Sequence, residues 1–301
     1  MKLEYSSFVA EDGATISYAD VGSGRPLVYL IGFDETVAGS NALLSRWSAR
    51  FRCIAFDHRG YGASTEGSEV GVDRSARDLQ ALLERLDLSD AALVGYSMGG
   101  SVALSYIEQF GDARLSRLVL ADATPKLINE DGWSFGLWQG RYTRADYEKD
   151  CRALLEDPAL FRLSFYLRAS TPSAPESPPQ FPTSDDSEEW LGVVVERTGI
   201  RERLARRVFF VDAPLERRET TLKYWRSMTG VDRRDAVKSI QASTLCLFAS
   251  PGSFYSPSTG RRLVELIPDA KLEVVADAAH TFPKDKFEEY ASRIESFCAE
   301  P

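Results

Sequence analysis

Short runs of consecutive apolar residues alternate along the chain with longer segments whose apolar residues recur every three or four positions. A continuous apolar run is typical of a strand buried on both faces of a sheet, and the second pattern is typical of an amphipathic helix. The predicted strands are residues 3–9, 14–21, 27–31, 52–56, 91–94, 115–121, 244–249 and 271–276. The predicted helices between them are residues 41–49, 73–86, 98–109, 257–266 and 283–298. This alternation predicts an α/β fold with a mostly parallel eight-stranded sheet flanked by helices, with the first two strands forming a hairpin.

The alternation stops between the sixth and seventh predicted strands. Residues 125–241 show helical patterns only, at 144–156, 159–168, 188–205 and 215–228, and a proline-rich loop at 170–184. A loop of this length is either mobile or functional. We therefore predict an α/β core formed by residues 1–124 and 242–301, with a helical cap of residues 125–241 inserted after the sixth strand.

The composition of the chain argues against several classes of function. The 301 residues carry a formal net charge of −9, and an acidic chain repels phosphate backbones, so we expect no nucleic-acid partner. The four cysteines are scattered and indicate buried thiols rather than a disulfide scaffold. With only two histidines in the chain, a histidine-rich metal site is not expected, and any histidine base must be one of these two.

The sequence shows neither a targeting segment nor a membrane-spanning run. Its first residues read as a strand rather than as a long apolar leader. No stretch approaches the roughly 18 uninterrupted apolar residues that a membrane helix needs. We therefore expect a soluble, cytoplasmic protein without a membrane partner.

The strongest chemical motif is Gly95-Tyr96-Ser97-Met98-Gly99, which follows an apolar strand and opens a helix. This is the context that a G-x-S-x-G nucleophile elbow requires. The serine of such an elbow lies in a strained turn, where side chains two positions away on either side would clash, and glycine removes them. Ser97 is thereby predicted as a nucleophile at the carboxyl edge of the sheet.

His280 lies between the last predicted strand and the last predicted helix. A histidine at this point reaches the same edge of the sheet and can act as the base for Ser97. The other histidine, His58, belongs to the stretch Asp-His-Arg-Gly-Tyr-Gly at residues 57–62.

Together these motifs resemble the α/β-hydrolase superfamily, in particular its esterases, enol-lactonases and cofactor-free haloperoxidase-like proteins. The resemblance extends over nearly the whole chain and implies the α/β-hydrolase fold with a cap. It also implies that His58 is structural, and that the backbone N–H groups of Phe33 and Met98 form an oxyanion hole. The family often has His-Gly after its third strand, whereas this chain has Ile31-Gly32.

The acid of the catalytic triad departs from the common pattern of the family. The G-x-x-D-x-x-x-P pattern that often follows the seventh strand has Ser253 at the aspartate position here. A known variation moves the acid to the end of the sixth strand, where this chain has Asp122. We therefore predict Asp122 as the acid, with Asp277 and a Ser–His dyad assisted by water as alternatives.

These predictions describe a serine hydrolase that needs no cofactor and no metal. The expected substrate is a small apolar or aromatic carboxylic ester or lactone, because the predicted cap holds four of the five tryptophans. One alternative is carbon–carbon bond hydrolysis or haloperoxidase-like activity on the same triad. Another is a ligand-binding protein with low turnover. The sequence leaves open whether the protein forms an oligomer.

Overall fold

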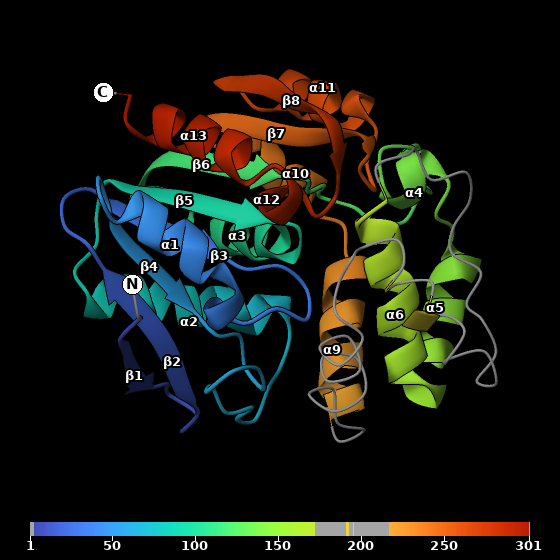
Figure 1. Ribbon diagram of the computed structural model, residues 1–301, viewed down its shortest axis with the longest axis horizontal. Coiled ribbons are helices and arrows are strands. Elements are labelled where there is room, and N and C mark those ends of the chain that lie inside the picture. The colour runs from blue at the N-terminus through green and yellow to red at the C-terminus, as the bar shows by residue number, and fades with distance from the viewer. Residues whose placement is uncertain (1–2, 172–190, 193–194, 196–216, 301) are drawn as a thin grey trace.

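The computed structural model describes residues 3–171, 191, 192, 195 and 217–300, and its centre is an eight-stranded sheet (Figure 1). The strand order is β1-β2-β4-β3-β5-β6-β7-β8. Strand β2 runs antiparallel to both β1 and β4, and every other neighbouring pair is parallel. The predicted parallel sheet with an N-terminal hairpin is confirmed.

The strands are β1 Tyr5–Val9, β2 Thr15–Val21, β3 Pro26–Leu30, β4 Arg52–Phe56, β5 Ala91–Tyr96, β6 Leu115–Ala121, β7 Ser243–Gly252 and β8 Ala270–Ala279. The helices of the sheet region are η1 Val37–Ser40, α1 Asn41–Trp47, α2 Val72–Arg85, α3 Met98–Phe110, α11 Pro257–Leu266, α12 Phe282–Asp285 and α13 Phe287–Cys298. Between β6 and β7 lie α4 Leu137–Gly140, α5 Arg144–Glu156, α6 Pro158–Ala169, α9 Arg218–Thr229 and α10 Arg234–Lys238.

Helices cover both faces of the sheet, as continuous apolar strands require. Helices α1 and α13 pack on one face, and α2, α3 and α11 pack on the other (Figure 1). The apolar cluster between the sheet and helices α2, α3 and α11 continues into α5, α6 and α9. These three helices stand beside the carboxyl ends of the strands (Figure 1), the edge at which α/β folds bind ligands.

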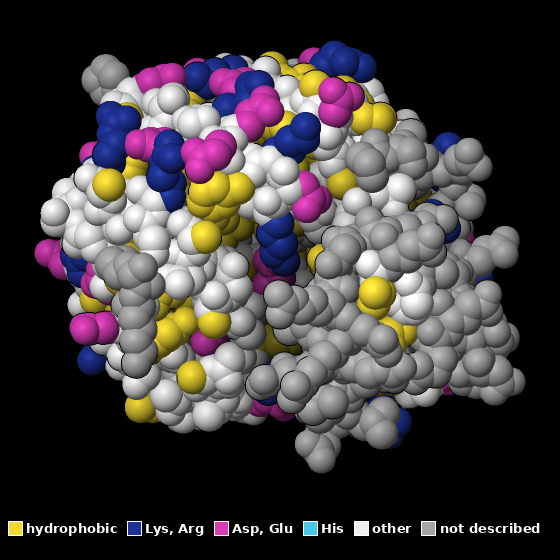
Figure 2. All heavy atoms as spheres, viewed as in Figure 1, with side chains coloured by type: hydrophobic (Ala, Val, Ile, Leu, Met, Phe, Trp, Pro, Cys, Tyr) yellow, Lys and Arg dark blue, Asp and Glu magenta, His cyan; other side chains and the backbone are white. Residues whose placement is uncertain are grey.

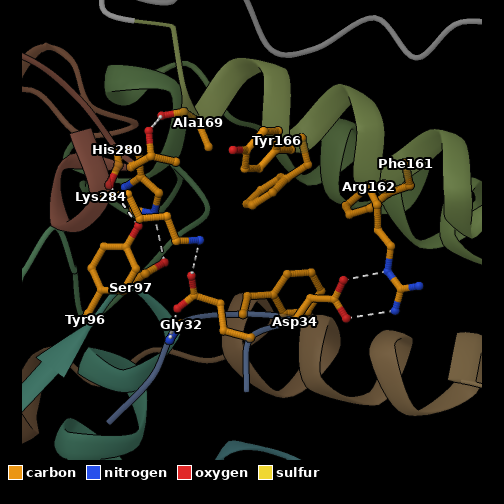
Figure 3. A pocket seen from close by; sticks show the side chains of 14 residues that line it. Gly32, Asp34, Tyr96, Ser97, Phe161, Arg162, Tyr166, Ala169, His280 and Lys284 are labelled. Carbon is orange, nitrogen blue, oxygen red and sulfur yellow. Dashed lines mark hydrogen bonds and ion pairs between the residues drawn. The ribbon is translucent and has the colours of Figure 1, made fainter. Parts of the chain in front are cut away.

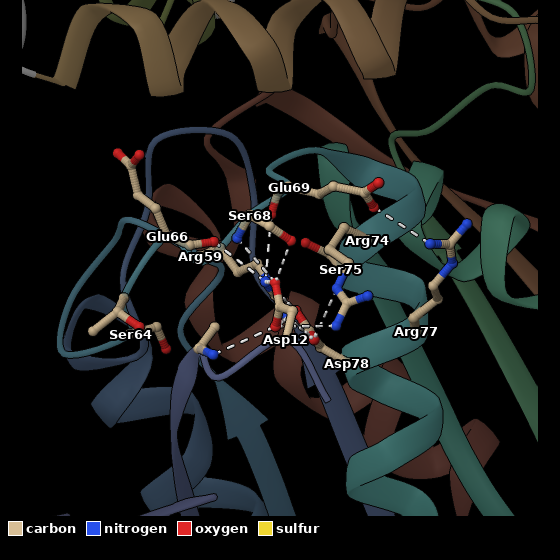
Figure 4. Close-up of polar contacts among 12 residues, drawn as sticks. Asp12, Arg59, Ser64, Glu66, Ser68, Glu69, Arg74, Ser75, Arg77 and Asp78 are labelled. Carbon is tan, nitrogen blue, oxygen red and sulfur yellow. Dashed lines mark hydrogen bonds and ion pairs between the residues drawn. The ribbon is translucent and has the colours of Figure 1, made fainter. Parts of the chain in front are cut away.

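A buried ion network fixes the hairpin to the sheet region (Figure 4). The fully buried Arg59 guanidinium binds the Asp78 carboxylate of α2 through two N–H donors, at 2.7 and 2.8 Å. It also donates to Asp12 in the β1–β2 turn at 2.6 Å. Arg74 donates to the same aspartate at 3.3 Å. Because one cation serves two carboxylates, the network ties the hairpin turn, the loop after β4 and α2 to one another.

The predicted final helix, residues 283–298, is divided in the structure. Lys286 separates α12 from α13 with φ −120° and ψ 43°, and this conformation takes the chain out of the helix for one residue. Hydrophobic spacing does not reveal such a break, so the prediction of one helix was wrong here. Helix α9 begins near the predicted start of its segment, and the short helices α4 and α10 were not predicted.

Other sequence predictions fall partly outside the described residues. These are most of the predicted helix 188–205, the predicted loop from residue 172 onward, and the first residues of the predicted helix 215–228. The division into a core and a cap of residues 125–241 stays a prediction. All four cysteines are buried and free, as expected. In the described part of the chain, the helices fall short of the length and apolarity that crossing a bilayer requires. On the face that Figure 2 shows, the described surface carries acidic and basic side chains mixed with one another.

Candidate active site

The turn from β5 into α3 presents Ser97 in a strained conformation. Its backbone has φ 53° and ψ −118°, a region that residues other than glycine rarely adopt. A Cβ atom on Gly95 would lie 2.6 Å from a backbone oxygen, and one on Gly99 would lie 2.1 Å from the Leu30 oxygen. The two glycines are therefore required for the close approach of the turn to its surroundings, as the sequence predicts.

The structure brings the three predicted catalytic side chains into one hydrogen-bonded row. His280 Nε2 lies 2.9 Å from Ser97 Oγ, and His280 Nδ1 lies 2.9 Å from Asp122 Oδ2. Asp122 follows β6 and His280 follows β8, while Ser97 follows β5. Because these strands are parallel and close to one another, their carboxyl ends meet at one edge of the sheet.

Asp122 is completely buried, and polar partners surround its carboxylate. Burial raises the pKa of this carboxyl group, whereas its hydrogen bonds to His280, to the Ser253 side chain and to the Ala249 N–H lower the pKa. The Ser253 hydroxyl accepts the Tyr255 N–H at 2.9 Å, which leaves its proton for the Asp122 carboxylate. Ser253, which the resemblance aligns with the usual acid of the family, thus contacts the carboxylate that is predicted in its place.

Two aromatic rings hold the His280 imidazole. Phe254 stacks on it at a centroid distance of 4.2 Å, and Tyr96 stacks on it at 5.4 Å. The Tyr96 hydroxyl also donates to the His280 carbonyl oxygen at 2.8 Å. The ring and its backbone are therefore restrained together, which limits the rotation of the base away from Ser97.

The two backbone amides predicted for an oxyanion hole come from different elements: Phe33 lies in the loop after β3, and Met98 begins α3. Met98 is the first residue of α3, so its N–H is one of the free donors at the helix N-terminus. In the described part of the structure, neither the Met98 N–H nor the Phe33 N–H has a hydrogen-bond acceptor. Both amides thus remain able to donate to a substrate oxygen.

Two ion pairs anchor the loop that carries Phe33. Asp34 receives two contacts from Arg162 of α6, at 2.6 and 2.8 Å. Glu35 accepts the Gly32 N–H at 3.0 Å with one oxygen and Lys284 of α12 at 3.0 Å with the other. The loop is consequently fixed both to α6 and to the segment that follows the catalytic histidine candidate.

A cavity of about 290 Å³ opens above Ser97 (Figure 3), close to the lower end of the roughly 300–1,000 Å³ typical of ligand sites. Ser97, His280 and Lys284 lie at one end of it, and the Asp34–Arg162 pair lies at the other. Its walls are largely aromatic, formed by Phe33, Tyr96, Phe161, Phe165 and Tyr166. We refer to it below as the main cavity.

The cap tryptophans form packing contacts rather than the cavity surface. Trp225 is buried and packs edge-to-face against Phe33 and Phe161, both at 5.4 Å. Trp138 packs against Phe254 at 4.5 Å. Trp190 lies outside the described residues. Trp225 therefore supports the cavity walls from behind, and Trp138 supports the Phe254 ring that stacks on His280.

Asp277 and His58, which the sequence analysis also considered, lie away from the hydrogen-bonded row that ends at Ser97. Asp277 is exposed to solvent, whereas the position beside His280 Nδ1 is occupied by Asp122. His58 is buried, with Nε2 at 3.4 Å from the Ile31 oxygen. Burial lowers the pKa of His58 to about 4, so its ring is neutral at pH 7. Its contacts fit the structural role that the resemblance implies.

Four charged residues of the site were missed in the sequence: Asp34, Glu35, Arg162 and Lys284. None of them belongs to a motif, and Arg162 and Lys284 resemble ordinary charges on a helix. Asp34 and Glu35, which directly follow Phe33, offered a signal by their position. The described residues contain no group of three His, Cys, Asp or Glu side chains arranged to bind a metal ion.

The model of the alpha/beta hydrolase fold family matches residues 34–287. The chain belongs to this family. An esterase from Exiguobacterium antarcticum superposes with a TM-score of 0.78 at 23% identity, covering 98% of this chain and 99% of that one. An enol-lactonase from Burkholderia xenovorans gives a TM-score of 0.71 at 17% identity, covering 98% of this chain and 100% of that one. At these identities the likeness shows the α/β-hydrolase fold, which confirms the predicted fold.

Curated relatives of this α/β-hydrolase include a putative non-heme chloroperoxidase of Synechocystis sp. It is 34% identical over 130 residues, which cover 42% of this chain and 47% of that protein. The match thus spans about half the length of that relative. An sn-1-specific diacylglycerol lipase of Mus musculus is 25% identical over 279 residues, covering 91% of this chain and 80% of that protein.

Proposed function

We propose that this α/β-hydrolase is a serine hydrolase that cleaves a carboxylic ester or lactone of a small apolar molecule. The observation that carries the proposal is the unbroken hydrogen-bonded row from Ser97 through His280 to the buried Asp122, with 2.9 Å at both contacts. An esterase and an enol-lactonase share the fold, and a diacylglycerol lipase is among the sequence relatives.

The reaction follows from the geometry of this row. Ser97 Oγ attacks the carbonyl carbon, and its proton passes to His280 Nε2. Asp122 accepts the Nδ1–H, which keeps the Nε2 lone pair toward the serine and stabilises the imidazolium ion that forms. The proton then goes to the leaving oxygen as the carbon–oxygen bond breaks. Water, deprotonated by His280, cleaves the acyl-enzyme and restores the Ser97 hydroxyl.

The Phe33 and Met98 amides stabilise the negative oxygen of the tetrahedral intermediate. A single donor of this kind is worth roughly 3–4 kcal/mol of transition-state stabilisation. The Met98 amide adds the positive end of the α3 dipole. The side chain at position 31 does not enter this step, because both donors are backbone groups.

The charges of the main cavity favour an uncharged substrate. Its two cations, Arg162 and Lys284, are each paired with a carboxylate, Asp34 and Glu35. Among the described lining residues, no cation is left to hold the acid group of a dienoate or diketone acid. This pairing supports ester or lactone cleavage over carbon–carbon bond hydrolysis.

Haloperoxidase-like activity is a second candidate, because the sequence relatives include a putative non-heme chloroperoxidase. Such activity would use the same Ser97 acyl-enzyme, with hydrogen peroxide in place of water, to release a peracid that oxidises halide. Halide oxidation that requires both a carboxylic acid and peroxide supports haloperoxidase-like activity. Ester hydrolysis without any halide oxidation supports the ester or lactone hydrolase.

A fluorophosphonate probe tests the proposal directly. We expect covalent labelling at Ser97, located by mass spectrometry, and no labelling of Ser97→Ala. A panel of esters and lactones then gives the turnover that the labelling implies. A folded protein that neither reacts with the probe nor cleaves any ester contradicts the proposal and favours a ligand-binding protein with low turnover.

A further inference from the structure

A second cavity of about 270 Å³ lies next to the main cavity. We refer to it as the side cavity. It is formed on the α1/α13 side of the sheet, where Leu43 of α1, Pro283 of α12 and Phe287 of α13 close over Tyr29 of β3. The walls are mostly apolar and aromatic, and the Ser40 residue of η1 adds a small polar group.

The two cavities share a boundary made of three residues: Glu35, Tyr96 and Lys284. Tyr96 forms a fixed part of it, because its hydroxyl is bound to the His280 carbonyl oxygen and its side chain is buried. Glu35 is also fixed, since one of its oxygens accepts the Gly32 N–H. The Lys284 side chain completes the boundary by its 3.0 Å contact with the other Glu35 oxygen.

Lys284 is the part of this boundary that can move. Its side chain is 53% exposed, and an ion pair with one partner this exposed contributes little to stability. A lysine also has a long, flexible stem, so its ammonium group can turn into solvent. The Glu35 carboxylate that it leaves is 22% exposed and keeps its hydrogen bond from the Gly32 N–H. Displacement of Lys284 would leave Tyr96 and Glu35 as the shared boundary, while the Arg162–Asp34 pair and the Gly32–Glu35 contact still hold the loop after β3.

We propose that the side cavity is a subsite for the apolar chain of the substrate, which passes Lys284 while its carbonyl group lies at Ser97. The inference rests on the proposed ester or lactone hydrolysis. It adds a class of substrate: esters with an extended unbranched chain. The apolar walls of the side cavity suit such a chain, and its charged lining residues in the described structure are only the paired Glu35 and Lys284.

Gly39 gives a way to narrow the side cavity without disturbing the fold. It lines this cavity but not the main one, and a Cβ atom on it would meet nothing within 4 Å. Gly39 is exposed, so Gly39→Trp adds an indole ring at the rim of the side cavity, where it narrows the entry. The matched control is Ala38→Trp, because Ala38 is an exposed neighbour in η1 that does not line the cavity.

The experiment compares kcat/KM for p-nitrophenyl octanoate with that for p-nitrophenyl acetate in the unmodified protein and in both variants. Each methylene excluded from an apolar site costs about fourfold. We expect Gly39→Trp to lower the octanoate-to-acetate ratio by at least about tenfold. Ala38→Trp should leave this ratio within about twofold of the unmodified value, as for an ordinary surface substitution.

A parallel series with octyl acetate and methyl acetate shows whether the chain belongs to the acyl or to the alcohol part. If Gly39→Trp lowers the long-chain to short-chain ratio in either series, the subsite is supported, and the series in which the ratio falls shows whether the chain belongs to the acyl or to the alcohol part. Ester turnover with unchanged ratios in both series overturns the subsite and leaves the proposed function standing. Absence of both ester turnover and Ser97 labelling in the unmodified protein overturns the proposed function, and the subsite with it.

Discussion

Replacement of Asp122 by asparagine tests the acid with almost no change of shape. Both carboxylate oxygens are engaged: Oδ2 lies 2.9 Å from His280 Nδ1, and Oδ1 accepts the Ala249 N–H at 3.1 Å. An amide has only one acceptor oxygen. If its NH2 group faces Ala249, two donors meet in a buried site. If it faces His280, Nδ1 must be an acceptor, and the proton then sits on Nε2, where it blocks proton transfer from Ser97.

The expected loss of kcat follows from the tautomer that His280 adopts. In serine hydrolases with a triad, the aspartate-to-asparagine change lowers kcat by about 10⁴, which corresponds to about 5.5 kcal/mol. We expect a loss of this order in Asp122→Asn, with little change in KM, because the substrate does not touch the buried carboxylate. Ser253→Ala is the matched control. It removes one hydrogen bond to a charged group, worth about 1.5–3 kcal/mol, so kcat should fall about ten- to hundredfold at most.

The assay is steady-state hydrolysis of p-nitrophenyl acetate by the unmodified protein and both variants. Near-ultraviolet circular dichroism confirms that each variant keeps its tertiary packing. Retention of more than a tenth of the kcat in Asp122→Asn refutes the assignment of Asp122 as the acid. A larger loss in Ser253→Ala than in Asp122→Asn refutes it as well, and indicates that position 253 controls the histidine.

Three further predictions concern the ion pairs and the buried acid. Arg59→Ala should destabilise the protein by about 3–5 kcal/mol in urea denaturation, because it removes both hydrogen bonds of the buried Asp78 carboxylate and leaves only Arg74, at 3.8 Å, as its cation. Burial raises the pKa of Asp150 to about 7, so the folded state keeps a proton that the unfolded chain loses near pH 4. The stability that Asp150 contributes should therefore fall as pH rises from about 4 to 7, so the free energy of unfolding of Asp150→Asn should fall less, or rise more, over this range than that of the unmodified protein in denaturation curves. Arg162→Gln should lower kcat about ten- to hundredfold by releasing Asp34 beside the oxyanion loop, and the charge-swapped pair Asp34→Arg with Arg162→Asp should recover part of the loss.

The regular part of the fold was predictable because its elements obey two simple periodicities. Parallel strands buried on both faces give unbroken apolar runs, and the helices that cover them show one apolar side. The eight strands were therefore found, with ends within a few residues of those observed. Helices α4 and α10 escaped because four or five residues are too few to show a period.

The nucleophile and the base were predictable for a different reason. The turn requires glycine at two fixed positions, because a Cβ atom on Gly95 or Gly99 would lie 2.6 or 2.1 Å from a backbone oxygen. His280 was found because the chain has only one other histidine. The ion pairs that anchor the loop after β3 leave no such pattern in the sequence. Asp34 pairs with Arg162, 128 positions away, and Glu35 pairs with Lys284, 249 positions away. Pairs this distant depend on how the helices pack, which a single sequence does not encode locally.

The presence of an acid at position 122 and of a hydroxyl at position 253 has a physical basis in the sheet. Strands β6 and β7 are parallel neighbours, so the residues that follow them reach the same side of the His280 ring. The Ser253 side chain hydrogen-bonds the Asp122 carboxylate, so carboxylates at both positions would be like charges in contact. Like charges this close raise the pKa of one carboxyl group and leave it protonated near neutral pH. One aspartate and one serine avoid that repulsion, and the serine hydroxyl instead stabilises the ionised form that His280 requires.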